Sequence, residues 1–575
     1  MAMHTRSKNV DLVVLGSGAG GMTAALSAAV LGLDVLLAEK AEWIGGTTSR
    51  SAGSLWVPNT RHSPPGSDSL DKALGYLRTA VGNRLREPMA LSFLQAAPEM
   101  VAFLEDNTSV AFRAYPYHPD YLATLQGATL SGRVVEPLPF DASVLGRDFA
   151  KIRPPLTEFT LFGGMMVDRT DIGHLLGATK SLISLRHTVR LLSRFAADRL
   201  RFARGTRLVM GNALVGRLYH SLLQRGVTIL TSTRAKSLTE SQGRVTGVVL
   251  QSAEGSSVVN SRAGVVLATG GYSHHSELRQ RLMPSGLLLL SPVVEIAAGE
   301  GIMLGERAGG YLGTNHANNS FWAPISLRTR PNGSTAVFPH LVLDRGKPGL
   351  IAVTPEGSRF VSEATNYHLF VEAMFAARKD SRATGCFLLC DHNFITKYGL
   401  GMVRPWRLNL RGAVADGYLT QTDTIEELAE RLAIPIHALV ETIVRHNGFA
   451  RTGVDEDFGK GRDAYQRNLG DPTHKPNPCI GPMAKPPFYA IKVYPGDIGA
   501  SCGLVTNENA QVLREDGTCV PGLYACGNDM DSIMAGIYPG PGITIGPAMT
   551  FGFLAARHAA NREAGAPGDV AMSAR

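Results

Sequence analysis

Residues 10–39 read VDLVVLGSGAGGMTAALSAAVLGLDVLLAE, and this stretch decides the fold. The apolar run at 10–15 is typical of a strand that is buried on both faces. A glycine-rich turn follows, and after it an Ala- and Leu-rich helix pattern is closed by Gly32. A second apolar strand then ends at Glu39. This order of strand, GxGxxG turn, helix, strand and acidic residue predicts a Rossmann-like α/β unit that binds a dinucleotide.

The glycines of the turn have separate tasks in such a unit. Gly16 permits the tight turn, Gly18 lets the backbone approach a pyrophosphate, and Gly21 lets the helix pack against the strand. The N-terminus of the helix then faces the phosphates. Glu39 can accept hydrogen bonds from both ribose hydroxyls.

Three further loops indicate which dinucleotide is bound. Residues 45–49 (GGTTS) offer consecutive backbone amides and hydroxyls, and ATGG at 268–271 and GLYACGN at 522–528 each end an apolar strand with another turn. A nicotinamide enzyme does not need these additional loops, whereas a tightly held flavin does, so we predict non-covalently bound FAD. The predicted cofactor contacts are Gly16, Gly18, Ala19, Gly20, Gly21, Glu39, Lys40, Gly46, Thr47, Thr48, Ser49, Ala235, Thr269, Gly270, Gly527, Asn528 and Ile545.

The composition narrows the class of protein. The 575 residues include 63 Gly but only 18% charged residues, and the net charge is 57 − 49 = +8. An apolar content of 44% excludes a disordered chain. The positive charge accompanies no nucleic-acid-binding motif, so we expect no nucleic acid partner. The six cysteines show no metal-ligand spacing, which predicts no metal site and a reducing cytoplasm.

Several longer motifs give the chain a resemblance to a known family. They are IGGTTSRSAGSLWVP (44–58), GTRLVMGNALVGRL (205–218), EGSRFVSEATNYH (356–368) and AGIYPGPGITIGPAMTFG (535–552). With them the sequence resembles the flavoproteins of the fumarate reductase and succinate dehydrogenase superfamily, and more closely the 3-ketosteroid Δ1-dehydrogenases. The resemblance implies an FAD-binding domain in two sequence pieces, 1–312 and 497–575, with an inserted α+β catalytic domain at 313–496.

Desaturation beside a ketone requires a polarised carbonyl oxygen, a base for the neighbouring carbon, and a flavin that takes hydride from the next carbon. The phenol of Tyr538 and the backbone N–H of Gly542, both in the YPGPG loop, can donate to one oxygen and form an oxyanion site. The resemblance implies the same pair, and it assigns the base to Tyr367. It also supplies a helper tyrosine for that base, which is Tyr121 in PYHPDYLATLQG or, alternatively, Tyr117.

Two histidines compete with the tyrosines for the role of base, because histidine titrates near neutral pH. His118 and His368 flank the two tyrosine motifs. If the segment after Tyr367 is extended, His368 points to the side opposite Tyr367.

The substrate remains open among three classes. A 3-ketosteroid or a smaller cyclohexanone-type ketone fits an uncharged pocket, whereas a fumarate-type dicarboxylate needs clustered Arg and His. The stretches 497–507 and 535–546 contain neither residue type. Arg345 alone lies where the reductases place their proton-donating arginine. We therefore expect an apolar ketone, foremost a 3-ketosteroid, and a quinone or similar electron acceptor.

An arginine-rich segment at 186–207 carries a large part of the positive charge. Arg186, Arg190 and Arg194 are four residues apart, so a helix there would have one basic and one apolar face. Such a helix can rest on an anionic membrane surface, where a water-insoluble substrate partitions. It can equally be a solvated helix over the core. The expected location is therefore the cytoplasm, with peripheral membrane association as the alternative.

Overall fold

The stretch at 10–39 folds as its motif predicts. In a computed structural model of the chain, strand β1 (Ser7–Leu15) leads through the glycine-rich turn into helix α1 (Ala19–Val30) and then into strand β2 (Val35–Ala38). β1 and β2 pair in parallel, and β2 is buried throughout, as in a sheet that is covered on both faces. The structure describes residues 7–285, 287–288, 290–377, 385–407 and 409–563.

The first sheet is built around β1 and mixes parallel and antiparallel pairs. Its strands lie in the order β10 (Thr228–Leu230), β2, β1, β13 (Gly255–Leu267), β12 (Arg244–Ser252) and β11 (Arg234–Ser241). The end of β13 also pairs in parallel with β21 (Cys519–Ala525), which in turn pairs with β20 (Gln511–Leu513). Residues from the C-terminal part of the chain therefore complete a sheet that the N-terminal part begins.

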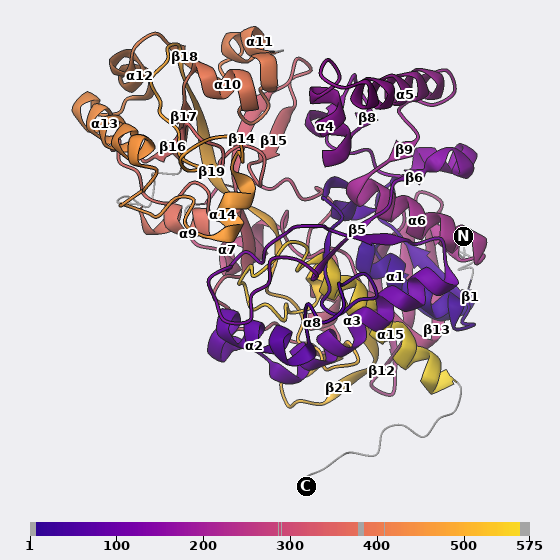
Figure 1. Cartoon of the computed structure of the whole chain (residues 1–575). Coiled ribbons are helices and arrows are strands. Elements are labelled where there is room, and N and C mark those ends of the chain that lie inside the picture. Colours follow the sequence, from indigo (N-terminus) through magenta and orange to yellow (C-terminus); the bar gives the residue numbers. More distant parts are fainter. Residues whose placement is uncertain (1–6, 286, 289, 378–384, 408, 564–575) are drawn as a thin grey trace.

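Helices cover this sheet and join the two ends of the chain. α1 packs against α15 (Ile545–Glu563) and α6 (Met210–Gln224), and α15 also packs against α3 (Glu87–Asn107). Figure 1 shows α15 beside α1 and α3 in this part of the molecule. The other helices of this region are α2 (Leu70–Val81), α7 (Ser276–Leu282) and α8 (Glu300–Arg307).

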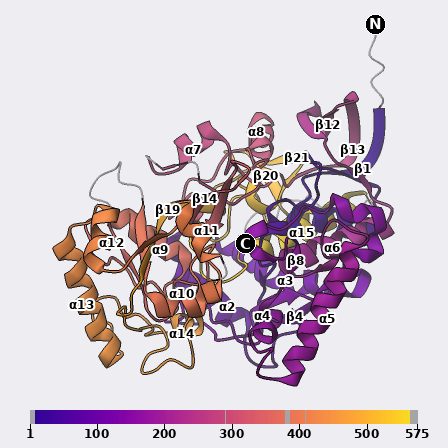
Figure 2. The same ribbon diagram turned by 90° about the horizontal axis from the view of Figure 1, so that it is seen from above.

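A second sheet forms from the middle of the chain, and its pairs are antiparallel. Its strands lie in the order β15 (Thr335–Pro339), β14 (Ser320–Thr329), β19 (Phe488–Ala500), β17 (Cys386–Cys390) and β16 (Leu350–Val353), and β18 (Thr420–Thr422) also pairs with β19. The helices around it are α9 (Tyr367–Ala376), α10 (His392–Tyr398), α11 (Leu410–Ala415), α12 (Ile425–Leu432), α13 (Ile436–Thr452) and α14 (Ala464–Leu469). This α+β part, in orange, forms a separate lobe in Figures 1 and 2.

Residues 424–449 read TIEELAERLAIPIHALVETIVRHNGF, a pattern that predicts helix, and the structure divides this stretch into α12 and α13. Ala433 has a left-handed φ of +54° and ends α12, and α13 starts after Pro435. Proline has no N–H for the helix ladder and disfavours helical geometry in the residue before it, so one continuous helix is excluded.

Short strands and two helices connect the main sheets. The strands are β3 (Leu55–Trp56), β4 (Phe112–Ala114), β5 (Val134–Pro137), β6 (Phe140–Asp141), β7 (Thr160–Leu161), β8 (Met165–Met166) and β9 (Arg207–Leu208). α4 (Arg169–Leu176) and α5 (Leu182–Arg199) pack on each other and stand at the edge of the molecule in both views (Figures 1 and 2). No helix in the described ranges combines the length and the apolar character that crossing a bilayer requires.

The predicted fold class is confirmed: a Rossmann-like α/β domain in two sequence pieces contains an inserted α+β domain. The limits 1–312, 313–496 and 497–575 remain predictions. β19 runs to Ala500 and pairs there with Ser320, so the second sheet continues a few residues past 496. The six cysteines lie among the described residues, and no disulfide joins any of them.

Candidate active site

The glycine-rich turn leaves open space where a phosphate would lie. Gly16 has φ +105°, and a Cβ there would stand 2.2 Å from the carbonyl oxygen of Ala268. A Cβ on Gly21 would meet the Gly16 oxygen at 2.1 Å, whereas one on Gly18 would meet only the Thr48 hydroxyl at 3.9 Å. Gly16 and Gly21 are therefore needed for packing, and Gly18 faces open space. In the part of the chain that the structure describes, the Gly20 and Gly21 amides at the start of α1 have no acceptor, so they can bind an anion.

The predicted cofactor contacts next to the turn make hydrogen bonds and an ion pair within the protein. The Glu39 carboxylate accepts hydrogen bonds from the Ser17 amide at 3.0 Å and from the Ala41 amide at 2.8 Å. Lys40 pairs with Glu300. Thr48 Oγ1 accepts from the Ala19 amide at 3.0 Å, which joins the loop at 45–49 to the start of α1. The remaining members of that loop, Gly46, Thr47 and Ser49, lie in or beside the same turn.

Most of the other predicted cofactor contacts directly follow strands of the first sheet. Thr269 and Gly270 follow β13, Gly527 and Asn528 follow β21, Ile545 starts α15, and Ala235 lies in the outer strand β11. Asp529, which sequence reasoning missed, organises two of these loops. Its buried carboxylate accepts hydrogen bonds from the Thr269 hydroxyl at 3.1 Å and the Gly271 amide at 2.8 Å. Its position directly after Gly527-Asn528 was the only signal.

A cavity adjoins these loops and the start of α15. Its lining includes Phe321, Asn528, Asp531, Ile533, Ile543 and Thr544. The lining is mainly apolar, and it combines residues at 500–551 with Phe321 of the second sheet. Together with the open turn at Gly18, this arrangement fits a long dinucleotide with a flat aromatic end.

Three predicted tyrosines gather beside the cavity, although they come from three distant segments. Tyr121, Tyr367 and Tyr538 are buried, and the Tyr121 hydroxyl lies 3.3 Å from the Tyr367 hydroxyl. The ring of Tyr538 lies 5.0 Å from that of Tyr367 and 5.6 Å from that of Tyr121, centroid to centroid. Phe321, which lines the cavity, packs edge-on against Tyr538 at 5.3 Å.

The YPGPG loop holds two of these tyrosines in a fixed relation. The Pro539 carbonyl accepts hydrogen bonds from the Tyr121 amide at 2.8 Å and from the Tyr76 hydroxyl at 2.6 Å. Gly542 has φ +85°, and a Cβ there would stand 2.2 Å from the Ser54 oxygen. Among the described residues, its amide has no acceptor. The Gly542 N–H is thus available to a ligand, as the oxyanion site requires.

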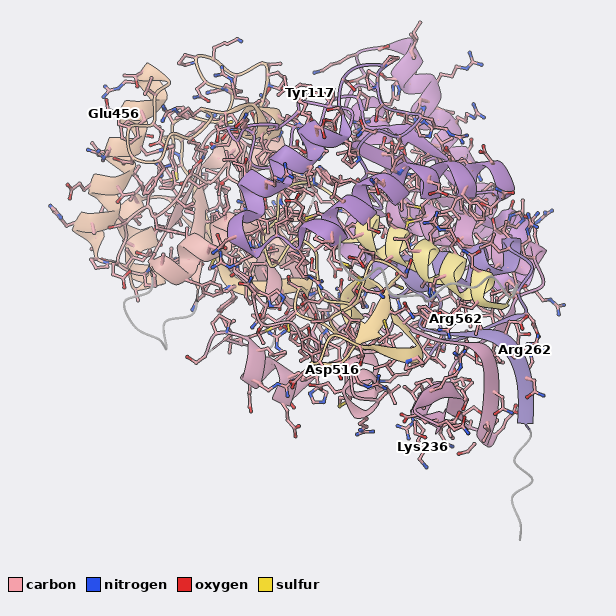
Figure 3. The ribbon with its side chains drawn as sticks, turned by 90° about the horizontal axis from the view of Figure 1, so that it is seen from below. Tyr117, Lys236, Arg262, Glu456, Asp516 and Arg562 are labelled. Atoms are coloured by element: carbon pink, nitrogen blue, oxygen red, sulfur yellow. The ribbon has the colours of Figure 1, made fainter. Side chains whose placement is uncertain are left out.

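The two candidate helper tyrosines lie in the loop at 115–121, but their surroundings differ. Tyr117 is 45% exposed and lies at the molecular surface in Figure 3, whereas Tyr121 is 6% exposed and contacts Tyr367. Of the two, only Tyr121 is placed to assist Tyr367.

Burial governs the titration of the tyrosine cluster. It raises the pKa of Tyr538 to about 12, against the opposing effect of the Tyr367 and Thr544 hydroxyls. Burial, followed by the neighbouring tyrosines, raises the pKa of Tyr367 well above its usual value. A Tyr367 phenolate therefore needs a stabilising donor or cation nearby.

Arg345 is a buried cation near the cluster, but its donors are occupied. Its guanidinium donates to the carbonyls of His340 at 2.9 Å, Leu341 at 3.0 Å and Glu363 at 3.0 Å. It also donates to the Thr365 carbonyl at 3.2 Å, just before Tyr367. Because these backbone carbonyls occupy the guanidinium, Arg345 is not placed to donate a proton to substrate.

A fourth tyrosine, Tyr465 of α14, belongs to the same cluster and was missed by sequence reasoning. Its buried ring lies 4.6 Å from the ring of Tyr121. The segment around it carries no motif, so no signal in the sequence marked it.

The two candidate histidines have different surroundings. His368 lies in the first turn of α9 rather than in an extended segment, because Asn366 caps that helix by accepting from the Leu369 amide. His368 is therefore buried instead of turned to the far side, and its Nδ1 accepts from the Trp322 amide at 3.0 Å. Burial lowers the pKa of His118 to about 4, and its ring lies 6.0 Å from that of Tyr121.

The glycine-rich turn, the second loop and the cavity define a flavin-binding protein. Residues 11–545 match the family described as FAD binding domain. The chain is 36% identical to 4-oxocyclohex-2-ene-1-carboxylate 5-dehydrogenase of Sinomonas cyclohexanicum, over 97% of this chain and 95% of that one. It is 35% identical to 3-oxosteroid 1-dehydrogenase of Mycobacterium tuberculosis, over 96% and 98%.

A solved structure agrees with these sequence matches. The 3-ketosteroid Δ1-dehydrogenase of Sterolibacterium denitrificans, in complex with 1,4-androstadiene-3,17-dione, superposes with a TM-score of 0.90 at 34% identity and covers 96% of this chain and 100% of its own. The chain therefore belongs to the 3-oxosteroid 1-dehydrogenase family of FAD-binding oxidoreductases, which act on CH–CH groups. Its cofactor is FAD, and the predicted class of reaction is confirmed.

Proposed function

We propose that the chain introduces a double bond between carbons 1 and 2 of a neutral 3-ketosteroid. The proposed catalytic residues are Tyr538, Gly542, Tyr367 and Tyr121. The observation that carries the proposal is the meeting of three buried tyrosines and one free glycine amide beside an apolar cavity. The relatives named 3-oxosteroid 1-dehydrogenase favour the same substrate class.

In this proposal the oxygen of the ketone accepts hydrogen bonds from the Tyr538 hydroxyl and the Gly542 amide. These two donors stabilise the negative charge that develops on the oxygen, which makes the neighbouring carbon acidic. Tyr367 takes the proton from that carbon, and Tyr121, at 3.3 Å, steadies the Tyr367 oxygen. FAD, when bound, accepts the hydride from the next carbon. Loops at Gly18, Thr48 and Gly527 would hold the cofactor.

The charges at the cavity favour a neutral ketone over the carboxylated rings that the Sinomonas relative is named for. The cavity lining includes the carboxylate of Asp531, which would repel an anionic substrate. Arg86, at 3.3 Å, and His316, at 2.7 Å, already pair with Asp531. Arg345 is occupied by carbonyls. A substrate carboxylate would therefore be buried without a partner, at a cost of several kcal/mol.

Anaerobic titration of the oxidised holoenzyme tests the substrate class. We expect a 3-ketosteroid to bleach the flavin absorbance, and 4-oxocyclohexanecarboxylate to do so more slowly. Bleaching by the carboxylated ring in preference to the steroid would contradict the neutral-ketone proposal. Bleaching by succinate and by neither ketone would overturn the whole assignment.

The same titration tests Tyr538. Tyr538→Phe should slow bleaching by about 10²- to 10³-fold, because one oxyanion donor is lost. FAD content should be unchanged, since Tyr538 lies outside the predicted cofactor loops. Tyr117→Phe, an exposed tyrosine of the Tyr121 loop, is the matched control and should react like the wild type. A normal rate in the Tyr538 variant would remove Tyr538 from the mechanism.

We infer that electrons leave to a quinone or a similar acceptor within a reducing compartment. The six described cysteines, which form no disulfide, are compatible with a reducing compartment. Stopped-flow mixing of the steroid-reduced enzyme with a soluble quinone should restore the flavin absorbance faster than air does.

We also propose that α5 rests on an anionic lipid surface. Leu191 is its one buried residue among those described, and Leu182, Ile183 and Val189 are 83%, 74% and 56% exposed. Arg186 and Arg190 are exposed beside them. The basic face is smaller than predicted, because Arg194 pairs with Asp141 and Arg207 with Asp171.

Vesicle flotation tests this contact. Vesicles with anionic lipid should carry the holoenzyme, and added salt should weaken the binding as charges are screened. The double variant Leu182→Ser, Ile183→Ser should bind several-fold less. Val444→Ser, which changes a 65% exposed apolar residue of the inserted domain, is the control and should bind normally. Equal binding of both variants would exclude α5 as the contact.

A further inference from the structure

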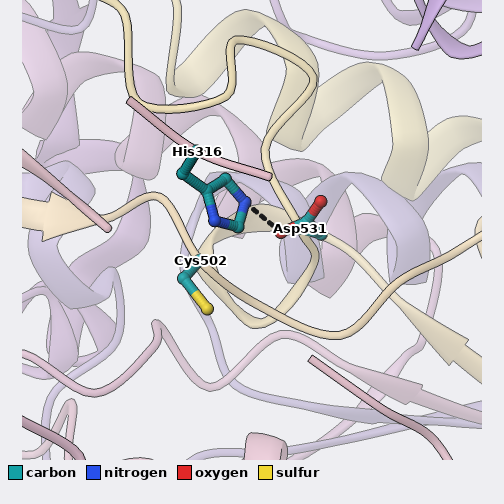
Figure 4. A group of neighbouring side chains, drawn as sticks. All are labelled: His316, Cys502 and Asp531. Carbon is teal, nitrogen blue, oxygen red and sulfur yellow. Dashed lines mark hydrogen bonds and ion pairs between the residues drawn. The ribbon is translucent and has the colours of Figure 1, made fainter. Parts of the chain in front are cut away.

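Three side chains with metal-binding atoms meet beside the cavity, although no local spacing in the sequence joins them. His316 lies between α8 and β14, Cys502 follows β19, and Asp531 follows the turn at Gly527–Asp529. One ligand atom from each lies within 4.8 Å of the other two (Figure 4). The cysteine spacing predicted no metal site, because the partners come from segments up to 215 residues apart.

One nitrogen of the group, His316 Nδ1, has no hydrogen-bond partner among the described residues. His316 Nε2 lies 2.7 Å from Asp531 Oδ1 (Figure 4), and the Cys502 thiol has the Gly313 carbonyl as a weak acceptor at 3.4 Å. The His316 side chain is only 2% exposed, and its Nδ1 has no partner in the described part of the chain. A buried imidazole nitrogen without a partner is costly, so a ligand here would be stabilising.

We propose that His316, Cys502 and Asp531 form a binding site for a thiophilic divalent cation of the Zn²⁺ class. Imidazole, thiolate and carboxylate are the ligand types that Zn²⁺ takes in proteins, and three protein ligands leave a fourth position for water.

To bind Zn²⁺, the three ligand atoms need to move only slightly closer together. Ligands at about 2.0–2.3 Å from Zn²⁺ lie roughly 3–4 Å from one another, so the widest separation must shrink by about 1 Å. Cys502 belongs to the loop that follows β19, and its side chain can move there without breaking a strand pair.

The charges around the group set the conditions for binding. A thiolate and the Asp531 carboxylate together balance a divalent cation, Arg86 opposes it, and Glu306 offsets Arg281 near Cys502. Binding of the cation must displace the proton of the Cys502 thiol, because the thiolate is the form that ligates a metal. This site is separate from the steroid proposal, and its test does not use steroid turnover.

Competition with a chromophoric chelator measures the site in the holoenzyme. After chelator treatment and dialysis, we expect one Zn²⁺ per chain in this assay. Cys502→Ser and His316→Gln should each weaken binding by at least about tenfold. Cys386→Ser, at a buried cysteine of the second sheet, is the matched control and should bind as the wild type does. Absence of stoichiometric binding, or equal affinity in all three variants, would overturn the proposal.

A spectroscopic measurement on the wild type keeps the test independent of variant folding. X-ray absorption at the zinc edge should show one sulfur ligand at about 2.3 Å beside nitrogen and oxygen ligands. A shell without sulfur would overturn the site. Flavin absorbance recorded on the same samples reports whether each variant has kept its fold and its cofactor.

Discussion

At the residue scale, Tyr367 is held in the tyrosine cluster because a buried arginine binds the chain just before it. Arg345 donates to the carbonyls of Glu363 and Thr365, and its guanidinium lies 4.8 Å from the ring of Phe370 one turn further on. The cation and the Tyr367 hydroxyl also interact electrostatically. Arg345 is therefore a positioning residue, and its charge lowers the free energy of a Tyr367 phenolate.

Arg345→Lys should slow flavin bleaching by about 10- to 100-fold, because a single ammonium cannot bind the same carbonyls and Tyr367 shifts. A less well placed cation raises the pKa of Tyr367, so the rise of the bleaching rate with pH should move to higher pH. FAD content should not change. Arg328→Lys, at an ion pair with Asp416 in the second sheet, is the control. An unshifted pH profile would show that Arg345 has no electrostatic effect on Tyr367.

At the scale of elements, the turn between β1 and α1 depends on missing side chains. Gly16 and Gly32, which flank α1, both have positive φ, +105° and +92°. They differ in their surroundings, because a Cβ on Gly16 would meet the Ala268 oxygen at 2.2 Å, whereas one on Gly32 would meet no atom within 4 Å. Alanine variants at these two positions therefore distinguish the effect of backbone strain from the effect of a collision with the neighbouring strand.

Gly16→Ala should lose most of its FAD and lower the thermal midpoint by many degrees, since the clash is with backbone that cannot move aside. Gly32→Ala should cost only about 1–2 kcal/mol of unfolding free energy, from the positive φ alone, and keep its FAD. The ratio of flavin to protein absorbance and thermal unfolding measure both. Equal behaviour of the two variants would contradict the packing argument.

At the scale of the whole molecule, stability depends on buried groups of the inserted domain. His446 of α13 is buried, and its Nε2 lies 3.0 Å from the Gly481 carbonyl. Burial, and then the charge of Lys460, lowers its pKa to about 4. Asp344, paired with His340, has its pKa lowered to about 2 despite burial. Both groups make acid unfavourable for the folded state.

The sign for His446 follows from linkage. In the unfolded chain a histidine gains its proton near pH 6.5, whereas the folded chain resists it until about pH 4, so stability falls as the pH drops through that interval. The loss amounts to about 3 kcal/mol. Urea unfolding at pH 7, 6, 5 and 4 should show a shallower decline for His446→Gln. His437→Gln, whose side chain is 94% exposed on the same helix, should follow the wild type. Parallel curves for wild type and His446→Gln would contradict this.

Local patterns predicted the parts of the molecule that depend on neighbouring residues. The strand, turn and helix at 10–39 follow from apolar periodicity and from glycines at fixed offsets. The pattern at 424–449 predicted helix but not the division at Pro435. The resemblance pointed to Tyr121 and left Tyr117 as the alternative, because both stand in one short loop.

The sequence therefore predicted the cofactor from glycines at short, fixed spacings, and the resemblance to a known family implied the class of reaction and the roles of Tyr538 and Gly542. Tertiary structure alone decided which loop tyrosine meets Tyr367, that Arg345 binds carbonyls, and that Tyr465 joins the cluster. It also brought His316, Cys502 and Asp531 together. The physical reason is the same in each case: burial and contact depend on segments that are hundreds of residues apart in the chain, and no local spacing records which of them will meet.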